Sequence, residues 1–266
     1  MTTTGSTSLV DTWEAWHAER ERVLVEPHGW LSLAGLHWLD GEARAYPGLP
    51  ATWRATDDGA VEIEAAPGDD VRVDGALAYG TVRVEPVDGA PGELVAVGER
   101  RVEVLRREHH LALRVRDPEA PARHAFTGVP AFAVEARWVV EGRYAPEAPR
   151  RIDVDTVVDG LGFHPTAVGT VTFELDGVAQ QLVALDDPDG LKLHFRDATS
   201  GSSTYGGGRV LRTGRPDDRG RVVIDLNRTL NLPCAFSTFA TCPLPPAGNT
   251  VTVPVEAGEK LPHEAH

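Results

Sequence analysis

Short segments in which apolar and polar residues alternate recur along most of this 266-residue chain. In AVEIEA (60–65), TVRVEP (81–86) and GTVTFELDG (169–177), every second side chain lies on the same face, as in a half-buried strand. The segments recur about every 10 residues, with turn residues between them and without alternating helices. This spacing predicts an all-β protein built from sandwich- or barrel-like lobes.

The alternating segments fall into two series. The first series comprises 60–65, 70–73, 81–86, 101–105 and 110–117. The second series comprises 132–140, 151–158, 169–177, 180–187, 190–195, 220–226 and 250–258. Asp-Gly pairs at 58–59, 74–75 and 88–89 predict hairpin turns within the first series, because Asp-Gly suits the tight turn between paired strands.

Helical spacing is clear only near the start of the chain. Residues 8–25 (SLVDTWEAWHAERERVLV) carry apolar residues at helical spacing, among them Trp13 and Trp16. Asp11 followed by Glu14 predicts a capping box in this helix. We expect the two tryptophans to anchor the helix on the body of the protein.

The stretch DPEAPARHAF (117–126) separates the two series, with two prolines and few apolar residues. Such a composition predicts a boundary between lobes, or a crossover between sheets. We therefore expect an N-terminal helical region (1–28), a first β lobe (29–120) and a second β lobe (121–266) that carries the functional site.

The charge balance bears on the partners of the protein. Lys and Arg number 26 against 40 for Asp and Glu, which gives a net charge of −14. This argues against binding to nucleic acid or to anionic membrane surfaces, because both require a basic face. The start has no signal-peptide pattern, and no stretch approaches the roughly 18 apolar residues of a membrane span. We expect a soluble cytoplasmic protein that binds neither nucleic acid nor membranes.

The least interchangeable residues gather in DLNRTLNLPCAFSTFATCPLPPAGN (225–249), which holds both cysteines and four prolines. FRDATSGSSTYGGGRVL (195–211) precedes it, and AGEK (257–260) follows it. Together with WEAWHAERERVL (13–24) and GWLSLAGLHWL (29–39), these motifs resemble a bacterial family catalogued as domain of unknown function 1684. The resemblance covers nearly the whole chain and implies no substrate or reaction.

The positions that match the family pattern are mostly polar residues, prolines and cysteines. They are Asp197, Thr199, Ser200, Gly201, Thr204, Tyr205, Arg209, Asp225, Asn227, Asn231, Pro233, Cys234, Ala235, Phe236, Cys242, Pro243, Leu244, Asn249, Glu259 and Lys260. The chain departs from the pattern at Val210 and Leu226, where we expect phenylalanine, and at Leu232, where we expect proline. These departures leave the polar set unchanged.

The first lobe carries a weaker resemblance. DDVRVDG (69–75), an alternating strand and RVEVLRREHHLALRVRD (101–117) are similar to forkhead-associated β-sandwiches. The arginine and serine loop pair that reads phosphothreonine in those domains has no match here. The similarity therefore implies a sandwich, and gives little support to phosphopeptide binding.

Patterns for metals and cofactors fail on spacing. Cys234 and Cys242 form C-x7-C, which is not a zinc-finger spacing, and DLNRTLN (225–231) lacks the glycine and terminal glutamate of a calcium loop. DATSG (197–201) resembles an aspartic-protease signature without its second copy, and the glycines at 206–208 are not followed by GK[ST]. We predict no metal site and no cofactor-binding residue, and the sequence identifies no cofactor.

A set of polar residues near strand ends remains as the candidate site: Asp197, Tyr205, Arg209, Asp225, Asn227, Arg228 and Asn231. In one interpretation they line the pocket of a small-molecule enzyme of hydrolytic or acid–base type. In the other they form a structural network in a non-catalytic ligand-binding or scaffold protein. An open cavity lined by Asp197, Arg209 and Asp225 would favour the enzyme, and mutual pairing in a filled interior would favour the second interpretation.

The enzyme hypothesis gives each residue a role. Asp197 or Asp225 would act as acid or base, and Arg209 would bind an anionic group of a small-molecule ligand. Tyr205 and Asn227 would orient the substrate. These assignments follow from the side-chain chemistry and from no known reaction of the family.

Cys234 is the candidate nucleophile of a covalent mechanism, with His164 or the pair at 109–110 as candidate bases. Two cysteines are too few for a disulfide scaffold. We therefore weigh the nucleophile against two buried thiols that pack in the core.

The segments GRVL (208–211) and RVVIDL (221–226) are joined by the polar connector RTGRPDDRG. A connector of this kind predicts an antiparallel hairpin, which would bring Arg209 beside Asp225.

Overall fold

The computed structural model describes residues 8–262, and these residues form two compact units. One unit, called here the sandwich unit, consists of Val23–Phe126. The other, called the half-barrel unit, combines the described residues up to Arg22 with those from Thr127 onward. The predicted boundaries at 28 and 120 stay a prediction, and each unit is described by itself.

The sandwich unit contains two antiparallel sheets. One is six-stranded with the order β1-β10-β9-β8-β5-β6, and the other is four-stranded with the order β2-β3-β4-β7. The strands are β1 (Leu33–Trp38), β2 (Arg44–Tyr46), β3 (Leu49–Ala55), β4 (Val61–Ala65), β5 (Val71–Val73), β6 (Ala76–Leu77), β7 (Gly80–Val84), β8 (Glu93–Val97), β9 (Arg100–Arg107) and β10 (His110–Arg116), with the short helices η1 (Trp30–Ser32) and α2 (Pro121–His124).

Both sheets of this unit contribute to one core. Trp53 and Ile63 of the four-stranded sheet and Val102, Val104 and Leu113 of the six-stranded sheet are all 0% exposed and belong to the same cluster. The alternation of the sequence thus places every second side chain between two sheets, as in a β-sandwich. The likeness to forkhead-associated domains stays a prediction.

Two of the three predicted Asp-Gly hairpins form. Asp74 and Gly75 both have positive φ, at 50° and 79°, as the turn between two paired strands requires, and they join β5 to β6. The pair at 58–59 joins β3 to β4. The pair at 88–89 was wrongly predicted, because it connects β7 to β8, which belong to different sheets.

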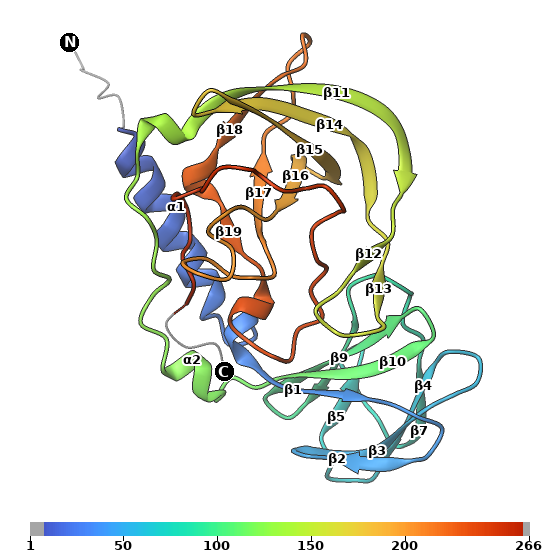
Figure 1. The fold of residues 1–266 in the computed structure, drawn as a ribbon. Coiled ribbons are helices and arrows are strands. Elements are labelled where there is room, and N and C mark those ends of the chain that lie inside the picture. Colours follow the sequence, from blue (N-terminus) through green and yellow to red (C-terminus); the bar gives the residue numbers. More distant parts are fainter. Residues whose placement is uncertain (1–7, 263–266) are drawn as a thin grey trace, which may run out of the picture. The chain divides into compact units, whose positions relative to one another are not determined.

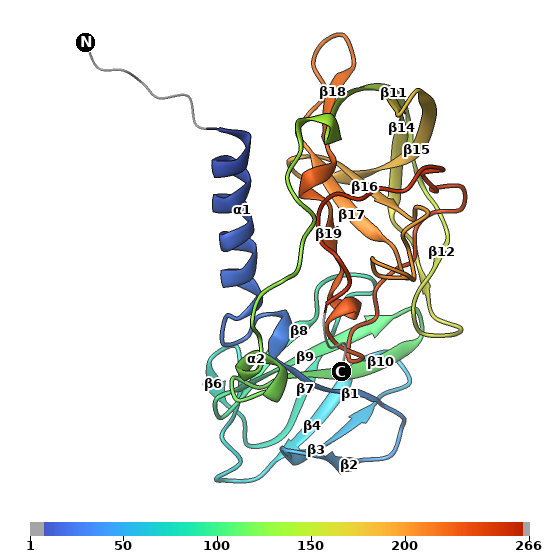
Figure 2. The same ribbon diagram turned by 60° about the vertical axis from the view of Figure 1, so that its left-hand side comes forward.

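The half-barrel unit contains a seven-stranded antiparallel sheet with the order β18-β11-β14-β15-β16-β17-β19 and a separate two-stranded sheet, β12-β13. Figures 1 and 2 show how the long strands β11 and β14 curve so that the sheet curls on itself. Its elements are η2 (Ala136–Trp138), β11 (Val139–Arg151), β12 (Val154–Asp155), β13 (Gly162–Phe163), β14 (Thr166–Leu175), β15 (Val178–Asp187), β16 (Gly190–Phe195), β17 (Arg209–Thr213), β18 (Arg221–Asp225), η3 (Leu226–Arg228), β19 (Leu230–Asn231) and η4 (Pro233–Ala235).

The C-terminal segment, residues 249–260, fills the interior of this curled sheet. Val251, Val255 and Ala257 are 0% exposed and belong to the same core cluster as Val171 and Leu193 of the sheet. The fold is therefore all-β with an N-terminal helix, as the sequence predicted.

The strand predicted over 250–258 does not form, although its alternate residues are buried. Its backbone forms an isolated bridge with Arg196 and is otherwise bonded in part by side chains. Thr252 N–H donates to Gln180 Oε1 and Val255 N–H donates to Asp197 Oδ1. Two other strands have bounds that differ from the prediction. The strand predicted over 132–140 begins at Val139 and continues to Arg151 as β11. Of the remaining residues predicted over 151–158, Val154–Asp155 form the short strand β12.

The N-terminal helix α1 (Leu9–Leu24) begins one turn earlier than its predicted capping box. Ser8 Oγ accepts from Asp11 N–H, and Asp11 Oδ2 accepts from Ser8 N–H, so the box is Ser8–Asp11 and the prediction of Asp11–Glu14 was wrong. Trp13 Nε1 donates to the carbonyl oxygen of Asn227 at 2.6 Å, which anchors the helix on the half-barrel unit.

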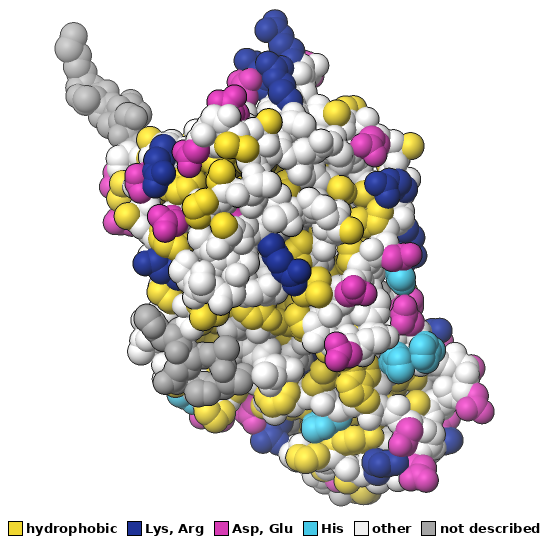
Figure 3. All heavy atoms as spheres, in the orientation of Figure 1, with side chains coloured by type: hydrophobic (Ala, Val, Ile, Leu, Met, Phe, Trp, Pro, Cys, Tyr) yellow, Lys and Arg dark blue, Asp and Glu magenta, His cyan; other side chains and the backbone are white. Residues whose placement is uncertain are grey.

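Within residues 8–262, no helix is long and apolar enough to cross a membrane. On the face shown in Figure 3, the Lys and Arg side chains of the described residues are scattered among Asp and Glu and form no continuous basic patch. The expected absence of nucleic-acid and membrane binding stays a prediction.

Candidate functional site

Arg209, at the start of β17, is the centre of a buried polar network. Its guanidinium is 0% exposed and pairs with Asp197, whose side chain is 1% exposed, at 3.1 Å. The same guanidinium donates to the carbonyl oxygens of Val255 (2.8 Å), Ala257 (2.6 Å) and Glu259 (2.9 Å). Burial lowers the pKa of Arg209, and the neighbouring Asp197 opposes that shift. Arg209 therefore ties the C-terminal segment to the sheet.

The carboxylate of Asp197 is also fully engaged. Oδ2 receives Arg209, while Oδ1 accepts from Thr199 N–H (2.7 Å), Thr199 Oγ1 (2.6 Å) and Val255 N–H (3.1 Å). Both oxygens of this carboxylate, whose side chain is 1% exposed, are occupied by groups of the protein itself, so neither faces a substrate. The geometry favours a structural role for Asp197.

A second arm of the network surrounds Glu259, which is 1% exposed. Its carboxylate accepts from Arg20 Nε of α1 at 3.1 Å and from the backbone N–H of Asn231 at 2.6 Å. Asn231 Nδ2 donates in turn to the carbonyl oxygen of Lys260. The sequence analysis missed Arg20, because its position on an amphipathic helix does not show which partner it meets.

Asp225 and Asn227 form a separate joint at the end of β18. Asp225 Oδ1 accepts from the backbone N–H (3.2 Å) and side chain (2.9 Å) of Asn227, and Asp225 also pairs with Arg228 at 3.4 Å. The Asn227 amide exchanges hydrogen bonds with the backbone of Glu135, and its carbonyl receives Trp13. Asn227 thus holds α1 and the approach to β11 in place.

The predicted hairpin between 208–211 and 221–226 was wrong, and Arg209 pairs with Asp197 rather than with Asp225. β17 lies between β16 and β19, where Arg209 faces Phe195 and Asn231. β18 lies at the other end of the sheet beside β11, where Asp225 faces Val139. Long strands already present offer both segments a partner, so the polar connector joins two ends of a curled sheet.

The two cysteines lie side by side on the same unit. Cys234 N–H donates to Cys242 Sγ at 3.3 Å, and Cys242 N–H donates to Cys234 Sγ at 3.1 Å. Burial, followed by the charges of Cys234 and Cys242, raises the pKa of Tyr205 to about 12. Of the candidate bases, His164 bonds Asp153, and the pair at 109–110 belongs to the sandwich unit.

His194 on β16 is a buried titratable residue that the sequence analysis did not single out. It is 1% exposed, and burial, followed by the charge of Lys192, lowers its pKa from 6.5 to about 3. Its Nε2 is buried without a hydrogen-bond partner among the described residues. His194 is therefore a neutral side chain near neutral pH.

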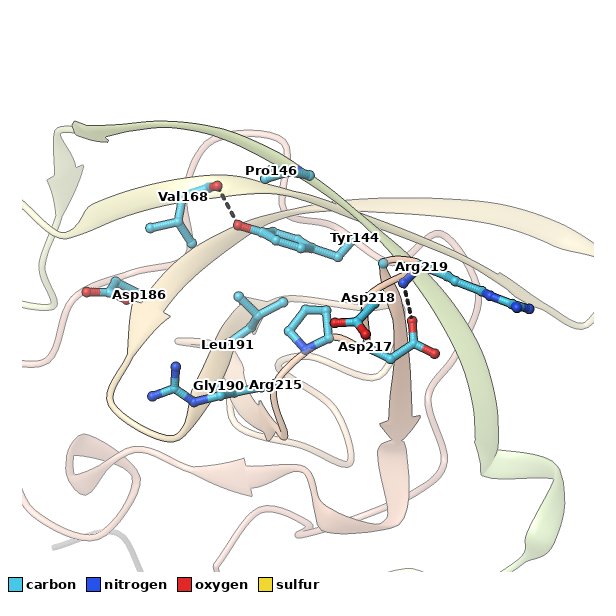
Figure 4. Close-up of a pocket in the computed structure, with 12 residues that line it drawn as sticks. Tyr144, Pro146, Val168, Asp186, Gly190, Leu191, Arg215, Asp217, Asp218 and Arg219 are labelled. Atoms are coloured by element: carbon cyan, nitrogen blue, oxygen red, sulfur yellow. Dashed lines mark hydrogen bonds between the residues drawn. The ribbon is translucent and has the colours of Figure 1, made fainter.

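A cavity of this unit lies away from these residues, at one end of the curled sheet (Figure 4). Its volume is about 680 Å³, and it is lined by Tyr144, Pro146, Val168, Asp186, Gly190, Leu191, Arg215, Pro216, Asp217, Asp218, Arg219 and Gly220. None of the predicted catalytic residues is in this lining. Within residues 8–262, no group of three or more His, Cys, Asp and Glu side chains is arranged to hold a metal ion.

Residues 124–260, just over half of the chain, match the family model described as "Protein of unknown function (DUF1684)". The chain belongs to this family. No curated protein matches it. A solution NMR structure of an uncharacterized protein from Haloarcula marismortui is 31% identical, with 52% of this chain and 78% of that chain covered, at a TM-score of 0.43.

The DUF1684 match is narrower than the resemblance that the motifs indicated. It leaves out α1 and nearly all of the sandwich unit, and it includes every predicted catalytic residue together with the whole lining of the cavity. The buried network and the cavity are therefore both features of the DUF1684 region.

Proposed function

We propose that this protein is a non-catalytic small-molecule-binding protein, and that its ligand is an organic cation with an apolar body. The observation that carries the proposal is the cavity of about 680 Å³ at the end of the curled sheet, which joins an apolar floor to a carboxylate rim. Cavities of this size that combine apolar walls with a few polar groups are typical small-molecule sites.

The floor of the cavity is aromatic and aliphatic. Tyr144, Val168 and Leu191 line it, and the Tyr144 hydroxyl donates to the carbonyl oxygen of Val168 at 2.6 Å, which fixes the ring (Figure 4). A fixed aromatic face attracts cations as well as apolar groups. This floor suits a ligand that carries an apolar group next to a positive charge.

The rim supplies negative charge. The side chains of Asp186 and Asp218 are exposed and form no hydrogen bond or ion pair with another described residue (Figure 4). Burial raises the pKa of Tyr144, and the charge of Asp186 adds to this shift. Two carboxylates at the rim favour a cationic ligand over an anionic one.

The arginines of the lining weaken this field only in part. Arg215 Nη2 donates to the carbonyl oxygen of Pro188, and the guanidinium of Arg219 points away from Leu191 (Figure 4). Arg209, which the sequence assigned to an anionic group, is fully buried and bonded to Asp197 and three carbonyl oxygens. An anionic ligand at Arg209 therefore has no support.

The contacts of the candidate residues support the enzyme hypothesis less than the non-catalytic alternative. Asp197 and Arg209 are paired with each other in a filled interior, which is the arrangement that favours a structural network. Asp225 is bonded to Asn227 and Arg228. These contacts of Asp197, Arg209 and Asp225 support binding without catalysis, and the assignment of the site residues stays a prediction.

A binding experiment tests the proposal. Phenethylammonium and cyclohexylammonium are compared with phenethyl alcohol and phenylacetate by isothermal titration calorimetry. We expect the ammonium compounds to bind most tightly and Asp218→Asn to weaken them about tenfold, which corresponds to about 1.4 kcal/mol. Asp159→Asn removes an exposed carboxylate of the same unit outside the cavity, and serves as the control. The proposal fails if phenylacetate binds as well as phenethylammonium, or if Asp218→Asn leaves the affinity unchanged.

A further inference from the structure

The segment that contains Cys234 and Cys242 is held firmly on the half-barrel unit. Cys234 lies in η4, where the N–H of Ala235 donates to the carbonyl oxygen of Leu232. The carbonyl oxygen of Cys242 accepts from Val157 N–H at 3.0 Å, and Leu244 N–H donates to Asp155 O at 2.7 Å. Hydrogen bonds on both sides therefore fix the positions of the two sulfurs relative to each other.

The reciprocal hydrogen bonds between the cysteines require close approach. Each Sγ lies 3.1–3.3 Å from the backbone nitrogen of the other residue. A disulfide joins residues whose Cα atoms are about 4.4–6.8 Å apart. In Cys234 and Cys242, each sulfur contacts the backbone of the other residue, so we infer that the two residues are close enough for this bond. A rotation of the side chains would then bring the two sulfurs together.

We propose that Cys234 and Cys242 are a redox-active dithiol that closes to an intramolecular disulfide by exchange with a low-molecular-weight disulfide. This site is independent of the cation-binding cavity, whose lining contains neither cysteine.

The surroundings assign the two sulfurs different roles. Cys234 is half-buried and accessible, whereas Cys242 is 7% exposed. A low-molecular-weight disulfide reaches a partly exposed thiol more readily than a buried one. Cys234 is therefore the attacking thiolate, and Cys242 is the resolving one.

The exchange balances with glutathione disulfide as the oxidant. The Cys234 thiolate attacks one sulfur of glutathione disulfide, the S–S bond breaks, and one glutathione leaves as a thiolate that takes up a proton. The Cys242 thiolate then attacks the Cys234 sulfur of the mixed disulfide, and the second glutathione leaves in the same way. The protein loses two electrons and two protons, and glutathione disulfide becomes two molecules of glutathione.

The test uses the full chain equilibrated in glutathione buffers of graded redox ratio, quenched with N-ethylmaleimide and analysed by mass spectrometry. We expect a single two-electron transition from two alkylated cysteines to none, in monomeric protein. In the same buffers with 8 M urea, we expect a disulfide equilibrium constant at least about tenfold smaller, because the fold no longer holds the sulfurs together. Equal constants in native and denatured chains, or two alkylated cysteines at every ratio, would overturn the proposal.

Two variants test the assignment of roles. Cys242→Ser should accumulate the glutathione adduct of Cys234, and Cys234→Ser should react at least about tenfold more slowly, because Cys242 is buried. Near-equal adduct formation in both variants contradicts the assignment. The wild-type equilibrium decides the proposal even if a serine variant fails to fold, and tryptophan fluorescence checks the folding of both.

Discussion

Arg209 and Arg221 each pair with an aspartate in the half-barrel unit, in opposite surroundings. The side chains of the Arg209–Asp197 pair are 0% and 1% exposed, and those of Arg221–Asp217 are 45% and 40% exposed. Burial lowers the pKa of Arg209, whereas the hydrogen bond from Arg221 to Asp217 raises the pKa of Arg221. The buried pair holds the C-terminal segment, and the exposed pair lies beside the rim of the cavity.

This contrast indicates that different residues of the DUF1684 region stabilise the fold and line the cavity. Polar residues of the long motifs, among them Asp197 and Arg209, bond the C-terminal segment, which forms isolated bridges but no continuous strand. The cavity is built from residues outside those motifs, such as Tyr144 and Leu191. A conspicuous polar motif can therefore have a structural role, in holding a chain segment in place. The proposed ligand site consists of less distinctive residues.

The largest effect is expected at the buried pair. Asp197→Ala leaves the guanidinium of Arg209 without its counter-charge and removes the acceptor of Thr199 and of Val255 N–H. Breaking a buried pair in this way costs about 3–5 kcal/mol. Urea denaturation of the variant should show this loss as a lower midpoint.

The matched control is Asp217→Ala, which breaks the exposed pair with Arg221. We expect a much smaller change in its urea midpoint. Exposed ion pairs contribute little, and the N–H groups of Arg219 and Arg221 that Asp217 also accepts lie where water can bond them. If Asp197→Ala and Asp217→Ala lower the urea midpoint equally, the buried pair does not stabilise the fold more than the exposed pair.

The next effect concerns two arginines on α1. Arg20 is 16% exposed and bonds Glu259, whose side chain is 1% exposed, while Arg22 and its partner Glu19 are both 59% exposed. Arg20→Ala should cost about 2–4 kcal/mol, because the buried carboxylate of Glu259 loses its cation and keeps the backbone N–H of Asn231 as a donor. Arg22→Ala should leave the urea midpoint unchanged. Equal midpoints for the two variants would contradict the buried role of Arg20.

His194 extends the comparison to pH. Its pKa is lowered from 6.5 to about 3 in the folded protein. Between pH 3 and pH 6.5, His194 is therefore protonated in the unfolded chain and neutral in the folded protein. Stability is therefore complete above about pH 6.5, and falls by up to about 1.4 kcal/mol per pH unit as the pH drops toward 3. Urea denaturation at several pH values should give a shallower acid limb for His194→Leu than for the wild type. His124→Gln, at an exposed histidine, is the control, and an unaltered limb in His194→Leu refutes the assignment.

The sequence predicted the fold class and most strands, because alternation directly reports which face of a strand is buried. It failed where the burial pattern and the backbone pairing diverge. Residues 250–258 alternate like a strand, yet Gln180, Asp197 and Arg209 bond their backbone. The register between distant strands was also out of reach, which is why Arg209 was assigned to Asp225 instead of Asp197.

The candidate site shows the same limit. In GLKLHF (190–195), Leu191, Leu193 and Phe195 form the apolar face, so alternation places His194 toward solvent. A Cβ on Gly208 would lie 3.3 Å from His194 Nε2, so backbone distant in sequence covers that face. Which face is covered depends on tertiary contacts that no local pattern encodes. The cavity escaped prediction for a related reason, since its lining comes from separate strands and one connector.

The smallest effect is expected at Tyr144, where the fold and the proposed ligand site meet. Tyr144→Phe removes the hydrogen bond from the hydroxyl to the carbonyl oxygen of Val168 and keeps the ring. Because that carbonyl lines an open cavity and can bond water, we expect a loss of about 0.5–1 kcal/mol in urea denaturation. Phenethylammonium affinity should change by less than about twofold, since the aromatic face remains. Tyr144→Leu should weaken this affinity about tenfold at a similar cost in stability. Unchanged affinity in Tyr144→Leu would show that the ring does not contact the ligand, and would leave the carboxylates of the rim as the sole basis for binding.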